Sequence, residues 1–289
     1  MVLSEGRVVH RPSSILVEHV YSNGTISRVA TGLVAVALLA VASCGKGEGL
    51  PGGPSSQRVT LKRAGSVEGA PLGYVEYLPP GYGDGSSRPL LLFLHGFGES
   101  GDGSETALGR LFKLGIPMLV QDDDWPEDRP FIVLMPQYGR DAAQDCQLAD
   151  EVDEFLTFAM DHYDVDEDRV YLTGVSCGAI GAWEYLGAHV DETVAGAVLI
   201  AGHASDAFER ASCALGRVPI WAFHGDADEI VPKSVIADTI RDLEACADPS
   251  PADVRLTIYP GADHDAWSQT YDLSAGHDIY AWLLAHKNP

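Results

Sequence analysis

A serine at the tip of a predicted tight turn is the residue of this chain best suited to nucleophilic chemistry. Ser176 lies at the centre of Gly174-Val175-Ser176-Cys177-Gly178, a Gly-x-Ser-x-Gly pattern. The run 170–172 before it is wholly apolar, as in a buried parallel strand, and apolar residues recur near helical spacing over 179–186. A strand, turn and helix would place the hydroxyl at a helix N-terminus, where backbone N–H groups can bind developing negative charge. The competing interpretation is a Gly-rich turn whose serine has no chemical role.

Two loops later in the chain carry the base and the acid that a serine nucleophile requires. A serine hydroxyl attacks a carbonyl when a base accepts its proton and an acid orients that base. The first loop reads His224-Gly225-Asp226-Ala227-Asp228, and the second reads Gly261-Ala262-Asp263-His264-Asp265. Because active groups in parallel-sheet folds lie after the carboxyl ends of strands, the order Ser, Asp, His predicts a triad at one sheet edge.

The elements expected around these loops alternate between strands and helices. Strands are predicted at 57–62, 72–78, 89–94, 131–135, 170–172, 194–201, 218–223 and 254–259, and helices at 106–114, 148–163, 179–186, 231–245 and 279–286. This alternation predicts an α/β fold with a doubly wound, mostly parallel sheet. No stretch between the elements is long enough for a separate lid domain.

Four motifs together carry a family resemblance. They are His95-Gly96-Phe97-Gly98-Glu99, the stretch 168–176, the acid loop at 224–228 and the base loop at 261–267. Over about residues 57–289 the chain resembles α/β-hydrolases of the carboxylesterase/phospholipase and dienelactone-hydrolase-like group. It is also similar to polyhydroxybutyrate depolymerase and feruloyl-esterase-like proteins. The resemblance implies a serine hydrolase of carboxylic esters that forms an acyl-enzyme intermediate. Ala179 departs from the pattern, since the family usually has a second glycine there, but it touches no catalytic role.

The resemblance assigns the catalytic roles residue by residue. Ser176 is expected to be the nucleophile, His264 the base and Asp228, the second aspartate of its loop, the acid. Alternatives stay open for both partners: for the acid, Asp226, Glu229 or Asp206, and for the base, His277. His95 and His224 each precede a glycine at a strand end, and we expect structural roles for them.

Backbone N–H groups are expected to form the oxyanion hole. The resemblance places these donors at Cys177, directly after the nucleophile, and at Phe97 in the loop after the 89–94 strand. Tyr138, Trp183 and Trp267 are candidates to line an acyl or aryl pocket, although aromatic side chains more often belong to the core.

The N-terminal stretch reads as an export signal. Residues 30–43 form a short uncharged apolar run after Arg28 and end in small residues, as signal-peptide cores do. Val41-Ala42-Ser43-Cys44 resembles a bacterial lipobox with Val41 in the usual leucine position, which implies cleavage before Cys44 and its lipidation. We therefore expect a lipoprotein signal peptide over 1–43, a flexible Gly/Pro/Ser-rich tether over 44–56 and a catalytic domain over 57–289. An ordinary secretory signal or a membrane-anchor helix is the alternative, and the true translation start stays open.

Besides Cys44, four cysteines are present. Cys213 precedes a predicted strand and Cys246 ends the helix that follows it, so both are expected at the N-terminal edge of the sheet, where a disulfide between them is an option. The state of Cys146 and Cys177 stays open. No cysteine spacing is typical of zinc, and neither a metal nor a cofactor is expected.

Composition narrows the choice of partners. The 289 residues carry a formal net charge of −23 and no basic stripe, which argues against nucleic acid. The expected partners are a small-molecule or polymeric ester and, through lipidated Cys44, a membrane of the bacterial cell envelope. A secreted or periplasmic soluble form is the alternative location.

Two other functions compete with the esterase: a serine peptidase of the same fold and a non-catalytic ligand-binding lipoprotein. The oligomeric state and the acyl and alcohol specificity stay open.

Overall fold

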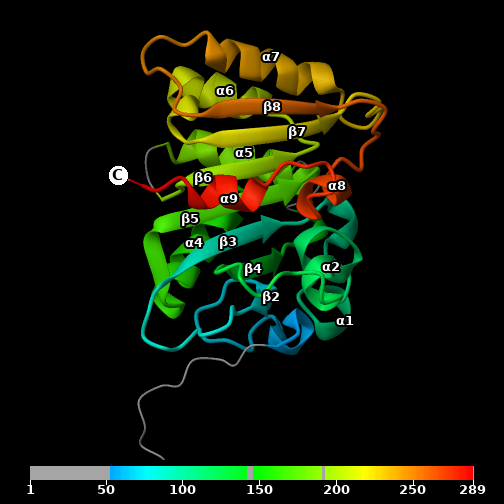
Figure 1. The fold of residues 1–289 in the computed structure, drawn as a ribbon, viewed down its shortest axis with the longest axis vertical. Coiled ribbons are helices and arrows are strands. Elements are labelled where there is room, and N and C mark those ends of the chain that lie inside the picture. Colours follow the sequence, from blue (N-terminus) through cyan, green and yellow to red (C-terminus); the bar gives the residue numbers. More distant parts are fainter. Residues whose placement is uncertain (1–52, 142–145, 191–192, 289) are drawn as a thin grey trace, which may run out of the picture. The chain divides into compact units, whose positions relative to one another are not determined.

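The structure, a computed structural model, describes residues 53–288 except 142–145 and 191–192. Within these residues, eight strands form one sheet in the order β1-β2-β4-β3-β5-β6-β7-β8 (Figure 1). The strands are β1 (Val59–Lys62), β2 (Gly73–Tyr77), β3 (Arg88–Leu94), β4 (Ile132–Gln137), β5 (Val165–Val175), β6 (Gly196–Ile200), β7 (Ile220–Gly225) and β8 (Val254–Tyr259).

The sheet is parallel from β4 through β8, and β2 pairs antiparallel with both β1 and β4. The inner parts of the central strands are mostly apolar and buried, as parallel strands covered on both faces require; Leu90 to Phe93 on β3 are fully inaccessible. This arrangement confirms the predicted mostly parallel α/β sheet.

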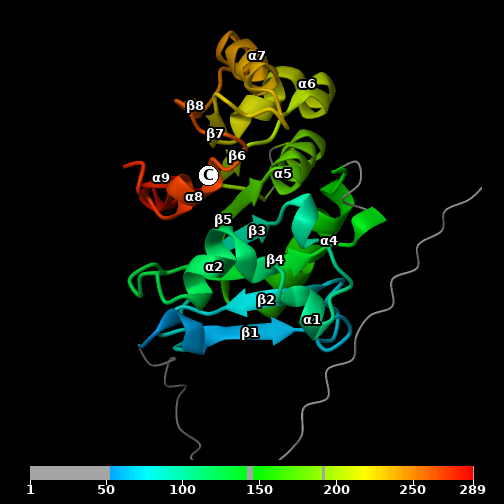
Figure 2. The same ribbon diagram turned by 90° about the vertical axis from the view of Figure 1, so that its right-hand side faces the viewer.

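Helices cover both faces of the sheet. The helices are α1 (Glu105–Leu108), α2 (Gly115–Gln121), α4 (Ala149–His162), α5 (Cys177–Ala188), α6 (Ser205–Ala211), α7 (Lys233–Glu244), α8 (Trp267–Tyr271) and α9 (Ile279–Leu284), with 3₁₀ turns η1 (Ser55–Arg58), η2 (Phe97–Glu99), η3 (Leu111–Lys113) and η4 (Ser212–Arg217). One core lies between the sheet and α4, α5, α6 and α7, and a second core lies under α2, α8 and α9 (Figure 2). The fold is therefore doubly wound, as alternating strands and helices predict.

Several short helices differ from the sequence prediction. The predicted helix at 106–114 is broken into α1 and η3, and α2 follows from Gly115, whose φ of 63° suits glycine. Pro117 lies in the first turn of α2, where its missing N–H costs no hydrogen bond. The helices α6 and α8 were not predicted, because five to seven residues are too few to show a helical period.

The described part of the chain begins before the predicted domain boundary at residue 57. Ser55 is buried and its hydroxyl donates to the Val120 carbonyl at 2.8 Å, while the Ser56 N–H donates to Asp123 at 2.8 Å. The last residues of the predicted 44–56 tether are thus bonded to residues of the predicted 57–289 domain. The predicted signal peptide at 1–43, the lipidation site Cys44 and the rest of the tether lie outside the described residues.

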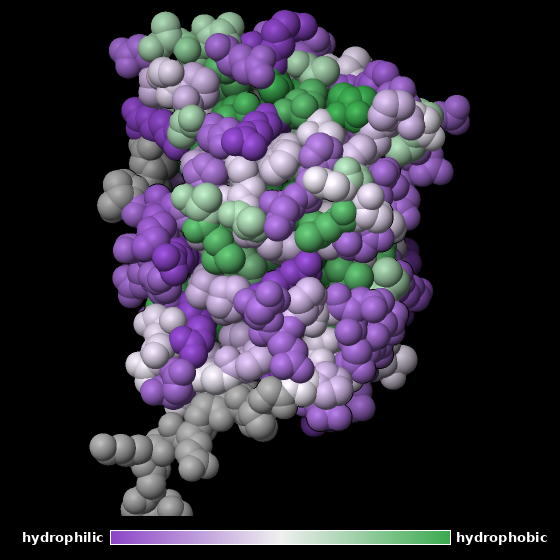
Figure 3. All heavy atoms as spheres, in the orientation of Figure 1, coloured by the Kyte–Doolittle hydropathy of each residue, from purple (hydrophilic) through white to green (hydrophobic). Residues whose placement is uncertain are grey.

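Polar side chains dominate the face shown in Figure 3, where hydrophobic residues form separate small patches. None of the described helices is long and apolar enough to cross a bilayer. A disulfide joins Cys213 on η4 to Cys246 just after α7, at the N-terminal edge of the sheet. The sequence left this pairing as an option, and the structure contains it.

We predict that Gly187→Ala lowers the free energy of unfolding by about 1–3 kcal/mol, because α5 and α6 touch at this glycine. An added Cβ would lie 2.8 Å from the backbone Cα of Ala207. Gly109→Ala is the control: Gly109 caps the C-terminal end of α1 with right-handed helical backbone angles, and the nearest atom to its Cβ is at 3.5 Å. Gly187 lies within α5, so its replacement also gains helix propensity, which offsets part of the packing cost. Chemical denaturation should find only Gly187→Ala destabilised, and wild-type stability in that variant would contradict the packing described.

Candidate active site

The candidate site lies at the point of the sheet where the chain stops adding strands on one side of β3 and begins adding them on the other side. The chain passes from β3 to β4 on one side and then returns to place β5 on the other side of β3. Loops at the carboxyl ends of adjacent parallel strands leave a crevice at such a point. The loop after β3 contains Phe97, and the turn after β5 contains Ser176. A Cβ built on Gly96 would lie 3.8 Å from the Ser176 Cβ, so the two loops are in contact.

Ser176 occupies a strained backbone conformation between β5 and α5. Its φ is 52° and its ψ is −121°, values that non-glycine residues rarely adopt. A Cβ at Gly174 would lie 2.6 Å from the Gly178 carbonyl carbon, and one at Gly178 would overlap the carbonyl oxygens that end β3. Only glycine fits at either position, so the turn closes tightly and Ser176 projects beyond the sheet edge.

The structure brings Ser176, His264 and Asp228 together. The Ser176 Oγ lies 2.9 Å from His264 Nε2, and His264 Nδ1 lies 2.8 Å from Asp228 Oδ2. The three side chains come from the loops after β5, β8 and β7, respectively. With Nδ1–H donating to the carboxylate, Nε2 is free to accept the serine proton.

Close backbone packing joins the acid loop to the base loop. A Cβ at Gly225 would overlap the carbonyl oxygens of Ala262 and Asp263, so glycine is needed where the two loops meet. The Ala227 N–H donates to the Ala262 carbonyl at 2.9 Å, and Asp226 Oδ1 accepts from the Gly261 N–H at 2.6 Å. These contacts fix the separation of Asp228 and His264.

Asp228 is buried but well supplied with donors. Its Oδ1 accepts the N–H groups of Ile230 and Val231, both at 2.9 Å. Burial acts to raise the pKa of Asp228, but the hydrogen bonds from His264 and from these two N–H groups outweigh it and hold the pKa below its ordinary value. Asp228 is therefore ionised at neutral pH, as an acid that orients an imidazole must be.

His224 supports the same carboxylate. It is fully buried, and its Nε2 lies 2.7 Å from the Val231 carbonyl and 3.2 Å from Asp228 Oδ2. Two acceptors around Nε2 indicate that this nitrogen carries the hydrogen. Within the described residues its Nδ1 has no hydrogen-bond partner. The structural role expected for His224 fits this place behind the acid.

The loop after β3 is held rigidly beneath the serine. His95 is fully buried and stacks on Tyr138, with ring centroids 3.7 Å apart. Its Nε2 accepts the Tyr138 N–H at 3.2 Å, so Nδ1–H donates to the Gly96 carbonyl at 2.6 Å. The Tyr138 hydroxyl donates to the His95 carbonyl. Gln137 adds a bond from its amide nitrogen to the Glu99 carbonyl at 2.8 Å.

The two residues predicted to supply the oxyanion donors each begin a helix. Phe97 opens η2 and Cys177 opens α5, and the N–H of a first helical residue has no acceptor within its own helix. The Phe97 side chain is 45% exposed and the Arg140 guanidinium lies 5.6 Å from its ring centroid, so Phe97 is at the rim of the site. The arrangement suits a developing negative charge between the two loops.

Two of the three predicted pocket aromatics do not line the site. Trp183 is 1% exposed in the core between α5 and its neighbours, because it lies on the inward face of a helix buried on all sides. Tyr138 is also 1% exposed, because stacking on His95 places its ring beneath the loop. Both predictions are corrected. Trp267 is half-buried, and its ring stands edge-on to the His264 ring at 5.2 Å, so it borders the site.

The alternative acids and base lie elsewhere. Glu229 and Asp206 are exposed, and Asp226 is engaged with the Gly261 N–H. His277 packs among the rings of Trp221, Phe223 and Tyr259. Of these candidates the structure brings only Asp228 and His264 into one hydrogen-bonded chain with the serine.

Two features of the site were not predicted. Ile230, on the acid loop, is 70% exposed, and it and Phe97 are the exposed large apolar side chains of the described residues. A disulfide joins Cys177 to Cys146, whose state the sequence left open. The sequence carries no local signal for this pairing, because it depends on how α4 packs on α5.

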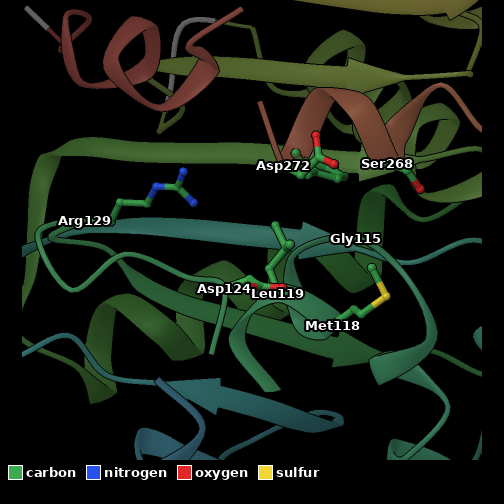
Figure 4. Close-up of a pocket in the computed structure, with 8 residues that line it drawn as sticks. Gly115, Met118, Leu119, Asp124, Arg129, Ser268 and Asp272 are labelled. Carbon is green, nitrogen blue, oxygen red and sulfur yellow. The ribbon is translucent and has the colours of Figure 1, made fainter. Parts of the chain in front are cut away.

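Other hollows lie outside the triad. One of about 350 Å³ lies beside α2 and α8, with Arg129 at its far end and Ser268 and Asp272 facing Met118 and Leu119 (Figure 4). A second, of about 490 Å³, lies beside the loop after β3 and includes Ser100 and Arg140. In the described residues, no group of three or more His, Cys, Asp or Glu side chains is arranged to hold a metal ion.

Comparison with known proteins identifies the family. The family model of dienelactone hydrolases matches residues 132–280, more than half of the chain and a span that contains Ser176, Asp228 and His264. The chain belongs to the dienelactone hydrolase family. This membership supports a hydrolase that acts on ester bonds. No curated protein matches the chain.

Solved structures share the fold of this dienelactone hydrolase family member. A thermostable esterase matches with a TM-score of 0.57 and 24% identity, over 80% of this chain and 64% of its own, so the chain spans less than two thirds of that protein. A mutant feruloyl esterase module from Clostridium thermocellum, complexed with sinapinate, matches at 0.55 and 17%, over 82% and 92% of the two chains. Thermogutta terrifontis esterase 2, phosphoramylated by tabun, matches at 0.53 and 16%, over 82% and 98%.

We predict that the burial of His95 lowers the free energy of unfolding at acidic pH. Burial lowers the pKa of His95 to about 4, whereas the unfolded chain binds a proton near pH 6.5. Because the pKa of His95 is lower in the folded protein, its contribution to the free energy of unfolding is complete above pH 6.5. This contribution is lost as pH falls toward 4, a change of about 3 kcal/mol. Denaturant unfolding at pH 7 and pH 4 should show this loss in the wild type. The difference should shrink by about that amount in His95→Gln, and an equal pH dependence in both proteins would contradict the assignment.

Proposed function

We propose that this protein is a serine esterase that cleaves carboxylic esters with Ser176, His264 and Asp228. The observation that carries the proposal is the continuous hydrogen-bonded path from the Ser176 hydroxyl through both nitrogens of His264 to a buried, ionised carboxylate. Membership of the dienelactone hydrolase family supports ester bonds as the target.

The geometry supports a two-step reaction. His264 Nε2 takes the Ser176 proton as Oγ attacks the ester carbonyl, and Asp228 stabilises the imidazolium through Nδ1–H. The Phe97 and Cys177 N–H groups stabilise the oxyanion of the tetrahedral intermediate. His264 then protonates the departing alcohol, which leaves an acyl group on Ser176. Water attacks this acyl-enzyme with His264 again acting as base, and the carboxylic acid is released.

The exposed side chains at the rim favour an ester with an apolar group. Phe97 is 45% exposed on the loop that carries one oxyanion donor, and Ile230 is 70% exposed on the loop that carries the acid. A single exposed apolar side chain is common on protein surfaces. Two of them on the loops around the proposed nucleophile would be removed from water by an apolar group of the substrate, which would make binding more favourable. We therefore place an acyl or alkyl chain of the substrate against them.

Export and lipid anchoring remain part of the proposal. Two disulfides in the described residues are typical of proteins that mature in an oxidising compartment, which supports passage out of the cytoplasm. The anchor at Cys44 follows from the lipobox resemblance, and a Cys44→Ser variant should lose incorporation of a radiolabelled fatty acid in bacterial cells. Equal labelling of both proteins would refute this site of attachment.

We predict that Ser176→Ala and Asp228→Asn abolish most esterase activity while Asp226→Asn does not. Loss of a triad serine typically costs a factor of about 10⁴ or more in kcat, and the Asp-to-Asn change about 10⁴ through the wrong imidazole tautomer. Asp226 is the matched control: it lies in the same loop and accepts the Gly261 N–H, a bond that asparagine can keep. Hydrolysis of p-nitrophenyl acetate and labelling by a fluorophosphonate are the measurements. Wild-type turnover no faster than that of Ser176→Ala would rule the esterase proposal out.

We predict that Ile230→Ser weakens the preference for longer acyl chains. The substitution removes an apolar surface but keeps the N–H that Asp228 accepts, so kcat/KM for p-nitrophenyl hexanoate should fall by about three- to tenfold relative to the acetate. Glu229→Ser, at the exposed neighbouring position, is the control and should leave the ratio unchanged. Equal ratios in all three proteins would remove Ile230 from the substrate site.

A further inference from the structure

A disulfide is attached to the residue directly after the proposed nucleophile. Cys177, the first residue of α5, is bonded to Cys146, which lies shortly before the start of α4, with the two Cα atoms 5.0 Å apart. The link spans 31 residues of sequence and joins the N-terminal ends of two neighbouring helices. Cys177 is 2% exposed, so its sulfur lies in the packed interior beneath the serine.

The attachment point matters because the backbone there is strained. Ser176 has a φ of 52°, and such a conformation persists only where the surroundings over-determine it. On one side the Ser176 N–H donates to the Ile200 carbonyl at 2.9 Å. On the other side the covalent link holds the Cα of Cys177. The peptide unit between these two residues carries the N–H proposed to bind the oxyanion, so it is held from both ends.

The partner end of the link is itself firmly placed. Leu148, two residues after Cys146, is fully buried against α5, and a Cβ at Gly181 would lie 2.5 Å from its Cδ1. Cys146 therefore connects Cys177 to the segment that leads into α4 and that packs on α5 through Leu148. By contrast, the Cys213–Cys246 disulfide lies at the opposite edge of the sheet, before β7 and after α7.

We propose that the Cys146–Cys177 disulfide is a positioning element of the active site, which holds the Cys177 N–H in the direction that the oxyanion requires. The inference rests on the proposed esterase function. An oxyanion donor acts in the transition state and much less on bound substrate, so loss of the link should lower kcat and leave KM nearly unchanged. A disulfide that serves stability alone would leave both constants unchanged in folded enzyme.

The test compares Cys146→Ser with the double variant Cys213→Ser/Cys246→Ser. Assays run below the thermal unfolding transition of every protein, so that only folded enzyme is compared. For p-nitrophenyl acetate, Cys146→Ser should show kcat about tenfold below the wild type with KM within about twofold, and the control should match the wild type.

Affinity for a boronic acid, which mimics the tetrahedral intermediate, should fall by the same factor as kcat. Cys146→Ser/Cys177→Ser should behave like Cys146→Ser, because it keeps the backbone N–H and removes the unpaired thiol.

Chemical reduction gives a reversible form of the same test. In the Cys213→Ser/Cys246→Ser background a phosphine supplies two electrons to the Cys146–Cys177 bond; water supplies two protons to the thiols and its oxygen to the phosphine oxide. Turnover should fall on reduction and return on reoxidation. Unchanged kcat and boronate affinity in folded Cys146→Ser would overturn the inference while wild-type turnover leaves the esterase function standing. Absent turnover in the wild type would overturn both.

Discussion

The close approach of α5 to the ends of β3 and β5 is the constraint on which the site depends. Gly174 and Gly178 meet at a distance that no side chain allows, and Gly178 also abuts the carbonyl oxygens that end β3. This contact forces the turn at Ser176 into its rare conformation and sets the first turn of α5 beside the loop that contains Phe97. One packing contact between a strand and a helix therefore places the proposed nucleophile and the proposed oxyanion donors.

Asp228 and His95 are both buried, but their surroundings leave the first charged and the second neutral. Burial alone would neutralise both Asp228 and His95. Asp228 is surrounded by N–H donors and stays ionised, whereas His95 has a stacked aromatic ring and one carbonyl acceptor and stays neutral. The charged carboxylate accepts the His264 N–H, and the neutral imidazole holds the loop that contains Phe97 without adding a positive charge there. Burial decides the charge state of His95, whereas the hydrogen bonds from His264 and from two backbone N–H groups decide that of Asp228.

The sequence was most informative where local pattern decides structure. Apolar runs predicted the central strands, and the motifs around Ser176, Asp228 and His264 predicted which loops meet, because parallel strands bring their carboxyl ends to one edge. It was least informative where distant packing decides. Trp183 and Tyr138 were placed at the pocket although tertiary contacts bury them, α6 and α8 are too short to show a period, and the partner of Cys177 depends on how α4 seats on α5.

One loop carries both Asp228 and the exposed side chain of Ile230, and this limits how substrate preference can change in evolution. Ile230 presents an apolar side chain to the solvent at the rim, and the same residue's N–H supports Asp228. A new side chain at this position alters the rim at little cost, since it leaves the main chain where it is. An insertion or deletion in the loop would move the carboxylate together with the binding surface. Diversification by point replacement is therefore open to this loop, whereas diversification by changes in loop length must come from segments that carry no catalytic group.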